Sequence, residues 1–498
     1  MFDGLLAFGH SIANFSTPQI IFYALLSSLV GVIMGALPGL TATMALALMT
    51  TLTLKLQPNE ALLILICTYV GAIYGGSRSA ILLNIPGTPA SAASCLDGYA
   101  LAKQGMAGRA MGIATTGSVL GTLIGMFFLA FFTPLLGNLA LKFGAYEFFW
   151  LALFGVIIAG TLTGDDPLKG WIAGIAGLFI AGIGQEPQYG FERFSYGVRD
   201  LAGGIQLVPA LVGAFGFAEL LTAIKERQAP IKISPFDTVI PKLKDITKYW
   251  KTILRSGLIG TGIGIVPGVG EDVAAWSSYA AAKRSSEEKE LFGKGSIEGL
   301  MAAETGDNAC VPGAIIPVLT LAIPGSAPAA VLMAAMIIHG VKPGPMIMIE
   351  NPQFVYDVVA MMLFATIGIL IYGLVLTKAL VQVLRVPQNF LIPIIFVLCV
   401  VGSFAIAGRM FDVYVMLIFG VIGFGLRHFG YPMAPLVLGI VLGDLLEKNL
   451  RRALILSDGD ISPFFTRPIS GVVATLIFGT IAWKIWDLRK KKLSKVSL

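Results

Sequence analysis

The chain has 498 residues, of which 56% are hydrophobic and only 13% are charged, against about 25% charged residues in soluble proteins. A larger soluble core cannot absorb this deficit, so the composition excludes a soluble globular protein and indicates an integral membrane protein. The net charge of +6 then reflects basic loops on one side of a membrane, and no nucleic-acid partner is expected.

The apolar runs are long and rich in Leu, Ile, Gly and Ala, which favours membrane-spanning helices over short alternating strands. Runs of about 20 apolar residues are long enough to span the hydrocarbon core. In the first half they fall at 18–36, 109–134, 146–162, 169–184 and 205–222. In the second half they fall at 253–270, 354–377, 390–407, 412–427, 431–447 and 468–486. The predicted fold class is therefore an all-α polytopic membrane protein with an extra C-terminal helix.

Two Pro-Gly pairs interrupt the apolar sequence in each half. They are Pro38-Gly39 and Pro86-Gly87 in the first half, and Pro267-Gly268 and Pro324-Gly325 in the second. The offsets agree closely (267 − 38 = 229 and 324 − 86 = 238), which indicates two homologous repeats. The segments between these pairs are predicted to be half-helices or re-entrant hairpins, at 40–54, 60–83, 88–102, 272–282, 296–322 and 326–340. Helices broken at equivalent places in a duplicated chain are the best sequence pointer to a secondary transporter's binding site.

The segment 223–255 is the one long polar stretch, and its eight basic residues outnumber its three acidic residues. Basic loops stay in the cytoplasm, so this segment and the basic tail at 489–495 are expected there, near lipid headgroups. The predicted organisation is a first repeat at 1–222, the basic loop, a second repeat at 256–450, and a C-terminal helix and tail at 451–498. With both basic regions on one side, the two repeats are expected to be inverted.

The residues at the breaks are the candidate substrate site. A helix that begins inside the bilayer presents free N–H groups and a partial positive charge, which suit a carboxylate. Neighbouring hydroxyl groups can bind further substrate oxygens. The candidate substrate-binding residues are Pro38, Gly39, Thr41, Arg78, Asn84, Pro86, Gly87, Thr88, Ser91, Pro324, Gly325 and Ser326. Simple structural kinks are the alternative, but four breaks in two matching pairs favour function.

Several charged residues lie in or beside the apolar runs. Arg78 is either a carboxylate clamp or partner of a membrane acid, or an arginine whose side chain snorkels to an interface. Asp97 is expected to end a helix or to form a loop salt bridge near Lys103. Asp165 and Asp166 are expected to cap a helix at a water-facing turn.

Acidic residues of the second half are the candidate cation site. Glu304, Asp307 and Asn308 fall at positions i, i+3 and i+4, hence on one face of a predicted helix. A hard cation requires several such oxygens, although an interior hydrogen-bonded cluster explains the same spacing. Glu271 and Asp272 follow the Pro267-Gly268 break directly and can equally serve as a helix cap. The candidate cation-binding residues are Gly268, Gly270, Asp272, Asp307 and Asn308.

Catalytic constellations are not recognisable in the sequence. The three histidines are scattered, the four cysteines lie in apolar segments, and no Walker A loop is present. An intramembrane enzyme would need a nucleophile with a base, or a metal constellation. We therefore expect neither an enzyme nor a bound cofactor.

The run from Tyr74 to Tyr99, YGGSRSAILLNIPGTPASAASCLDGY, is similar to a known family, as are the runs 264–270, 303–309 and 319–345. It closely resembles the large membrane subunit (TctA-type) of the tripartite tricarboxylate transporters, and the resemblance covers essentially the whole chain. The resemblance implies uptake of a carboxylate across the bacterial inner membrane, coupled to Na⁺ or H⁺. Citrate, another tricarboxylate or a dicarboxylate would fit.

The same resemblance implies two partner proteins. They are a small membrane subunit (TctB-type) and a periplasmic solute-binding protein (TctC-type). A stand-alone carboxylate carrier and a channel stay open as alternatives, as does the formation of a homodimer.

Overall fold

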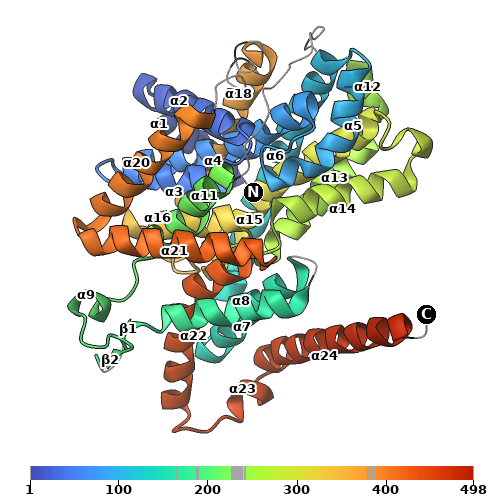
Figure 1. Ribbon diagram of the computed structural model, residues 1–498. Coiled ribbons are helices and arrows are strands. Elements are labelled where there is room, and N and C mark those ends of the chain that lie inside the picture. Colours follow the sequence, from blue (N-terminus) through green and yellow to red (C-terminus); the bar gives the residue numbers. More distant parts are fainter. Residues whose placement is uncertain are drawn as a thin grey trace. The chain divides into compact units, whose positions relative to one another are not determined.

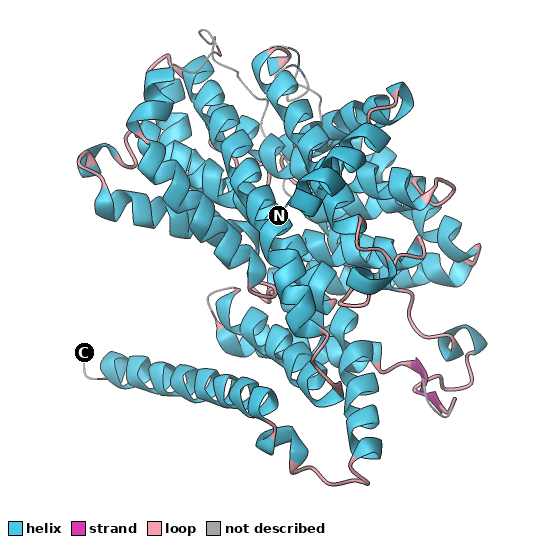
Figure 2. Cartoon of the chain, turned by 180° about the vertical axis from the view of Figure 1, so that it is seen from behind, coloured by secondary structure: helices cyan, strands magenta, loops and turns pink. Residues whose placement is uncertain are grey.

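The computed structural model describes residues 2–163, 166–186, 190–225, 239, 243–377, 379, 382 and 388–496. Within these ranges the chain is almost entirely helical, and the strands described are the two short ones coloured magenta in Figure 2. The predicted all-α class is confirmed. Most of the central basic segment (226–238 and 240–242) and Asp165 lie outside the described residues.

The chain divides into two compact units, each discontinuous in sequence. Unit 1 comprises residues 1–138 and 208–424, and unit 2 comprises residues 139–207 and 425–498. Each unit therefore takes segments from both sequence repeats.

Unit 1 is built from helices that belong to both halves of the sequence (Figure 1). Its first-half helices are α1 (Phe2–Phe15), α2 (Pro18–Ala36), α3 (Ala42–Leu52), α4 (Pro58–Leu83), the 3₁₀ turn η1 (Pro89–Ser91), α5 (Ala92–Lys103), most of α6 (Ala107–Ala140), α10 (Leu207–Leu211), the π-helical η2 (Val212–Phe217) and α11 (Ala218–Lys225). Its second-half helices are α12 (Leu243–Lys248), α13 (Trp250–Ile265), α14 (Gly270–Ser285), η3 (Lys289–Leu291), α15 (Ile297–Leu321), α16 (Ala327–Ile338), α17 (Ile347–Glu350), α18 (Phe354–Leu374), α20 (Gln388–Ala407) and most of α21 (Met410–His428).

Unit 2 is smaller and contains the antiparallel β1–β2 pair. Its elements are α7 (Ala145–Leu162), α8 (Pro167–Ala181), β1 (Gly184–Gln185), β2 (Glu192–Arg193), α9 (Arg199–Ala202), α22 (Met433–Leu456), α23 (Pro463–Thr466) and α24 (Pro468–Val496). Asp166 caps α8 as predicted, because its side chain accepts the Leu168 N–H at 3.0 Å.

Eight helices in the described part of the chain are long and apolar enough to cross a membrane, as expected of a multi-pass membrane protein. The prediction of a half-helix at 60–83 is wrong, because α4 is an unbroken helix of 26 residues. The same holds for 296–322, where α15 runs for 25 residues through Pro312 and Pro317. Prolines are tolerated inside such helices when neighbouring helices satisfy the freed backbone groups. The remaining short segments are helices of 11 to 16 residues, as predicted.

Glycines bring α2 into close contact with α4. A Cβ atom on Gly31 would lie 2.4 Å from the Thr68 carbonyl oxygen, and one on Gly35 would lie 2.0 Å from that of Ala72. Only glycine permits this approach of two helix backbones, a common device of membrane helix packing.

The second half repeats this packing between α13 and α15. A Cβ atom on Gly260 would lie 2.1 Å from the Gly306 carbonyl oxygen, and one on Gly264 would lie 2.6 Å from that of Cys310. Gly260 follows Gly31 by the same offset as the first pair of breaks (260 − 31 = 229). Gly306 follows Thr68 by the offset of the second pair (306 − 68 = 238). The helix contacts thus repeat in the register of the Pro-Gly pairs.

Helices α13 and α14 fold back on each other around the Pro267-Gly268 break. Lys248, just before α13, forms an ion pair of 2.7 Å with Glu288, just after α14, and Tyr249 donates to the same carboxylate at 3.0 Å. The Lys248 hydrogen bond lowers the pKa of Glu288. Both partners are more than a third exposed, so the pair contributes little stability. It does place both ends of the hairpin at the same side, as a re-entrant hairpin requires.

Helices α4 and α15, which occupy equivalent positions in the two halves, run antiparallel. Tyr69, in the middle of α4, contacts Ser326, just beyond the C-terminal end of α15. Ile81, near the end of α4, belongs to one apolar cluster with Leu300, near the beginning of α15.

Partly buried charge pairs join the elements of unit 2. In α7, Glu147 accepts hydrogen bonds from Arg467 at 2.8 Å and from Ser470 at 2.9 Å. On β2, Arg193 binds both oxygens of Glu447 in α22, at 2.6 and 2.9 Å. Bidentate geometry of this kind fixes orientation as well as contributing energy.

Candidate functional site

The breaks in the two halves have the same backbone conformation. Asn84 (φ 57°) and Ala322 (φ 56°), which end α4 and α15, are left-handed, a conformation that side chains with a Cβ atom seldom adopt. Gly39 (φ 90°) and Gly268 (φ 73°) are left-handed where α2 and α13 have ended. Asparagine adopts this conformation more readily than other residues with a Cβ atom, whereas alanine is strained in it, so the surroundings must fix the turn at Ala322.

After each of these turns the chain folds back onto the helix that it has just left. Gly87 donates its N–H to the Gly76 carbonyl at 3.3 Å, and Gly325 donates to the Ala314 carbonyl at the same distance. Ser326 then caps the N-terminal end of α16. The predicted substrate-binding residues of the second break in each half therefore lie in two equivalent loops, in which Gly87, Thr88, Gly325 and Ser326 are buried, whereas Asn84 and Pro86 are exposed.

The hydroxyl group of Tyr69 connects the two halves. It hydrogen-bonds to Glu271 Oε1 and lies 2.6 Å from Ser326 Oγ, and all three residues are buried. Glu271 therefore does more than cap α14, whose N-cap residue is Val269. Sequence reasoning missed Tyr69, because one tyrosine in an apolar helix is an ordinary packing residue.

A second buried cluster surrounds the acidic face of α15. Glu304 accepts hydrogen bonds from Ser94 at 2.5 Å and from Ser118 at 3.0 Å. The amide nitrogen of Asn308 donates to Asp307 Oδ1 at 2.7 Å and to Ser118 Oγ at 3.0 Å. All five residues are fully buried. The predicted clustering of Glu304, Asp307 and Asn308 is confirmed, whereas the serines that bind Glu304 were not predicted.

Arg78 is 1% exposed, so the prediction that its side chain snorkels to an interface is wrong. Its guanidinium carbon lies 4.4 Å from the centroid of the Tyr74 ring. The two terminal nitrogens approach Met111 Sδ at 3.2 Å, Ser77 Oγ at 3.3 Å and Thr115 Oγ1 at 3.4 Å. No carboxylate of the described residues forms an ion pair with Arg78. The nitrogen Nε has no hydrogen-bond partner among them.

Arg78 and Glu304 are both buried against the same face of α6, where they contact Thr115 and Ser118, three residues apart on that helix. Replacing Arg78 by Met should therefore destabilise the folded protein by about 3 kcal/mol, because a buried charge loses its compensation. The double variant Arg78→Met/Glu304→Gln should recover part of this loss. Thermal unfolding in detergent of the wild type, both single variants and the double variant completes the cycle. Strictly additive effects would contradict the coupling.

Asp97 ties α5 of the first half to the loop that precedes α15. Its Oδ1 atom accepts the N–H groups of Gly293 at 2.8 Å, Gly295 at 2.9 Å and Ser296 at 2.8 Å. Its Oδ2 atom accepts the hydroxyl of Tyr279 at 2.9 Å. Four donors stabilise a buried carboxylate without a cation, so Asp97 fixes the position of α5.

The prediction that Asp97 ends a helix or pairs with Lys103 is wrong. Helix α5 continues to Lys103, whose ammonium group lies 4.7 Å from the centroid of the Tyr99 ring. The partners of Asp97 are mainly backbone amides almost 200 residues further along the chain. Because almost every residue has a backbone amide, the sequence does not reveal such partners.

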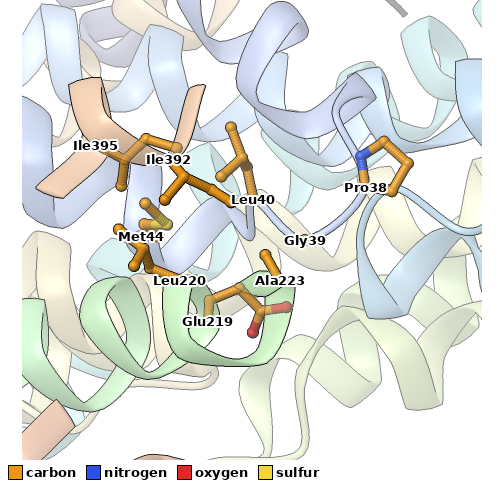
Figure 3. Close-up of a pocket in the computed structure, with 9 residues that line it drawn as sticks. All are labelled: Pro38, Gly39, Leu40, Met44, Glu219, Leu220, Ala223, Ile392 and Ile395. Atoms are coloured by element: carbon orange, nitrogen blue, oxygen red, sulfur yellow. The ribbon is translucent and has the colours of Figure 1, made fainter. Parts of the chain in front are cut away.

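A small pocket, with a cavity volume of ≈ 20 Å³, lies beside the Pro38-Gly39 break in unit 1 (Figure 3). It is lined by Pro38, Gly39, Leu40, Met44, Glu219, Leu220, Ala223, Ile392 and Ile395. The Glu219 carboxylate approaches Gly39, with Oε1 3.7 Å from the position of a Cβ atom there. Glu219 follows η2, and π-helical segments often mark functional sites. Because a carboxylate is the one charged group in the lining, this pocket does not suit an anion.

The other predicted residues lie at helix ends. Thr41 caps α3 by accepting the Met44 N–H at 3.2 Å, and Ser91 exchanges hydrogen bonds with the backbone of Thr88. The N–H of Gly268 donates to the Pro324 carbonyl at 3.3 Å, which joins the two broken loops of the second half. Gly270 and Asp272 lie in the first turn of α14.

Comparison with known proteins gives three matches. The sequence profile of the tripartite tricarboxylate transporter TctA family matches residues 21–438. A protein of Agrobacterium vitis, described as an uncharacterized 52.8 kDa protein in the TAR-I ttuC′ 3′ region, is 34% identical over 481 residues, which are 96% of each chain. A second Agrobacterium vitis protein, described as uncharacterized in the TAR-II ttuC′ 3′ region, is 37% identical over 211 residues, 42% of this chain and 87% of that protein. No solved structure matches the chain.

Proposed function

Because the chain belongs to the tripartite tricarboxylate transporter TctA family, we propose that it carries a carboxylate across the bacterial inner membrane by secondary active transport. The family is one of transporter subunits, so the chain is a multi-pass membrane protein and not an enzyme. The proposed substrate is a tricarboxylate such as citrate, or a dicarboxylate. The proposed driving force is a gradient of Na⁺ or H⁺.

Transport of this kind requires partners. Transporters of this family generally combine the large membrane subunit with TctB-type and TctC-type subunits. We propose that the present chain likewise takes its substrate from a periplasmic solute-binding protein and works beside a small membrane subunit.

The two repeats are proposed to be inverted, with alternating access around their shared centre. The antiparallel direction of α4 and α15 supports this arrangement, since these helices occupy equivalent positions. So does the pairing of helix ends. By the repeat offsets, α3 corresponds to α14 and α5 corresponds to α16. The C-terminal end of α3 contacts that of α16 through Thr53 and His339 at 3.2 Å. In the corresponding contact, α5 binds the loop after α14 through Asp97.

The substrate carboxylates are proposed to bind at the equivalent loops after Asn84 and Ala322. The observation that supports this proposal is the matching pair of left-handed turns, each followed by a loop that folds back onto the preceding helix and by the N-terminal end of a new helix, α5 after η1 or α16. The proposed substrate residues are the predicted ones of these two loops, namely Asn84, Pro86, Gly87, Thr88, Ser91, Pro324, Gly325 and Ser326, with the buried cation Arg78 of α4 as a further candidate. Pro38 and Gly39 are not included, because the Glu219 carboxylate lines the same pocket. The cation is proposed to bind among Gly268, Gly270, Asp272, Asp307 and Asn308.

Uptake by reconstituted membrane subunits tests this function. We expect uptake of one labelled di- or tricarboxylate from a panel to require both the solute-binding protein and an inward cation gradient. Uptake without the binding protein would favour a stand-alone carrier. Failure of every carboxylate, with protein that is folded by circular dichroism, would contradict the substrate class.

A further inference from the structure

The two halves place different residues at one pair of equivalent positions. Tyr69 and Ser326, which hydrogen-bond across the halves at 2.6 Å, have repeat counterparts at the offset of 238. Position 69 corresponds to Asp307 (307 − 69 = 238), and position 326 corresponds to Thr88 (326 − 88 = 238). Asp307 of the second half thus occupies the place of a tyrosine, and Thr88 the place of its hydroxyl partner.

The hydrogen bonding is complete at the tyrosine position and incomplete at the aspartate position. Asp307 Oδ2, Thr88 Oγ1 and Asn308 Oδ1 have no hydrogen-bond partner among the described residues. The three side chains are nonetheless buried, with exposures of 0%, 2% and 0%. An aspartate is shorter than a tyrosine by the length of its aromatic ring, so it cannot reach across as Tyr69 does.

These three atoms are all oxygens, and their neighbours are already satisfied. The Asn308 amide nitrogen donates to Asp307 Oδ1 and Ser118, whereas its oxygen accepts no hydrogen bond from the described residues. Glu304 is saturated by two serine hydroxyls. A buried carboxylate oxygen without a donor is costly unless a proton or a cation satisfies it.

We infer that Asp307 Oδ2, Asn308 Oδ1 and Thr88 Oγ1 bind a dehydrated monovalent cation of the size of Na⁺. The donor set consists only of hard oxygens, which selects an alkali or alkaline-earth ion over a transition metal. A single carboxylate in the set matches a single positive charge. This inference rests on the proposed cation coupling. It limits the proposed cation ligands to three residues and assigns Thr88 to the cation site instead of the substrate site.

Binding is measured on the purified chain without substrate or binding protein. At constant ionic strength, NaCl should raise the thermal unfolding midpoint in a saturable manner relative to choline chloride and KCl. In Asp307→Asn and Thr88→Val, the apparent affinity for Na⁺ should fall about tenfold or more, since the first removes the negative charge of the site and the second removes one ligand oxygen. Tyr69→Phe changes the residue that is equivalent to Asp307 in the first half, where the hydrogen bonds are complete. This variant should keep the wild-type affinity for Na⁺ within about twofold.

Two results would overturn the inference. Equal responses to Na⁺ and K⁺, with a stabilisation at low pH that Asp307→Asn abolishes, would make Asp307 a proton site. Unchanged Na⁺ affinity in both ligand variants would place the cation elsewhere. Neither result bears on receptor-dependent uptake, so failure of this inference is separable from failure of the proposed function.

Discussion

Gly87→Ala and Gly325→Ala should each reduce substrate uptake about 100-fold, because both break the loops that we propose to hold the substrate. A Cβ atom on Gly87 would lie 2.1 Å from the Gly35 carbonyl oxygen, and one on Gly325 would lie 2.0 Å from that of Gly264. Both distances are far below van der Waals contact, and a backbone carbonyl cannot relieve the clash by a change of rotamer as a side chain can. The loop must move, and with it the N–H groups. Uptake into proteoliposomes, normalised to inserted protein, measures the effect.

Gly262→Ala is the matched control for these two variants. Gly262 lies in α13 of the same hairpin as Gly264, but a Cβ atom there meets no atom within 4 Å. It should insert and transport like the wild type. If Gly87→Ala and Gly325→Ala also transport normally, the proposed role of the broken loops is wrong. Because the two loops are equivalent, a large loss in one variant and none in the other would confine the substrate to one half.

Asp97→Ala should lower the free energy of unfolding by about 3–6 kcal/mol, because it leaves three amide donors and one hydroxyl without their buried acceptor. The amides belong to Gly293, Gly295 and Ser296, and the hydroxyl to Tyr279. Helix α5 should detach from the loop before α15 and take Ser94 away from Glu304. Chemical or thermal unfolding in detergent measures the loss.

Asp97→Asn separates the charge from the geometry. The asparagine oxygen can still accept the three amides, but bonds to a neutral acceptor are roughly half as strong. We expect an intermediate loss of stability. Glu290→Ala, an exposed acidic residue of η3 in the same loop, is the control and should change stability by less than about 0.5 kcal/mol. An Asp97→Ala variant as stable as this control would refute the anchoring role.

The helical class and the repeat could be predicted from the sequence because they rest on composition and on Pro-Gly pairs. The predicted helix at 18–36 matches α2, and the turns after Asn84 and Ala322 lie at the expected breaks. The lengths of α4 and α15 were missed. Glycine, serine and proline make these segments resemble loops, whereas close packing against α2 and α13 sustains them as helices.

The polar network was only partly predictable. Spacing placed Glu304, Asp307 and Asn308 on one helix face, because helical periodicity is a local property. The partners Tyr69 and Ser94 belong to the other half and are brought close only by the fold. Such residues become visible when the two halves are compared position by position, as the correspondence of Tyr69 with Asp307 illustrates.

The hydrogen bonds that join the two halves have a consequence for biosynthesis. Tyr69, Ser94 and Asp97 find their partners 182 to 257 residues later in the chain. A ribosome that adds 5–20 residues per second needs about 10–50 s to produce the partners. Throughout that interval these polar groups of α4 and α5 lack their partners, and a polar group without a partner is costly wherever the helix lies in lipid. We therefore expect the first half to remain beside the insertion machinery, where water can hydrate these polar groups, until the second half has been synthesised.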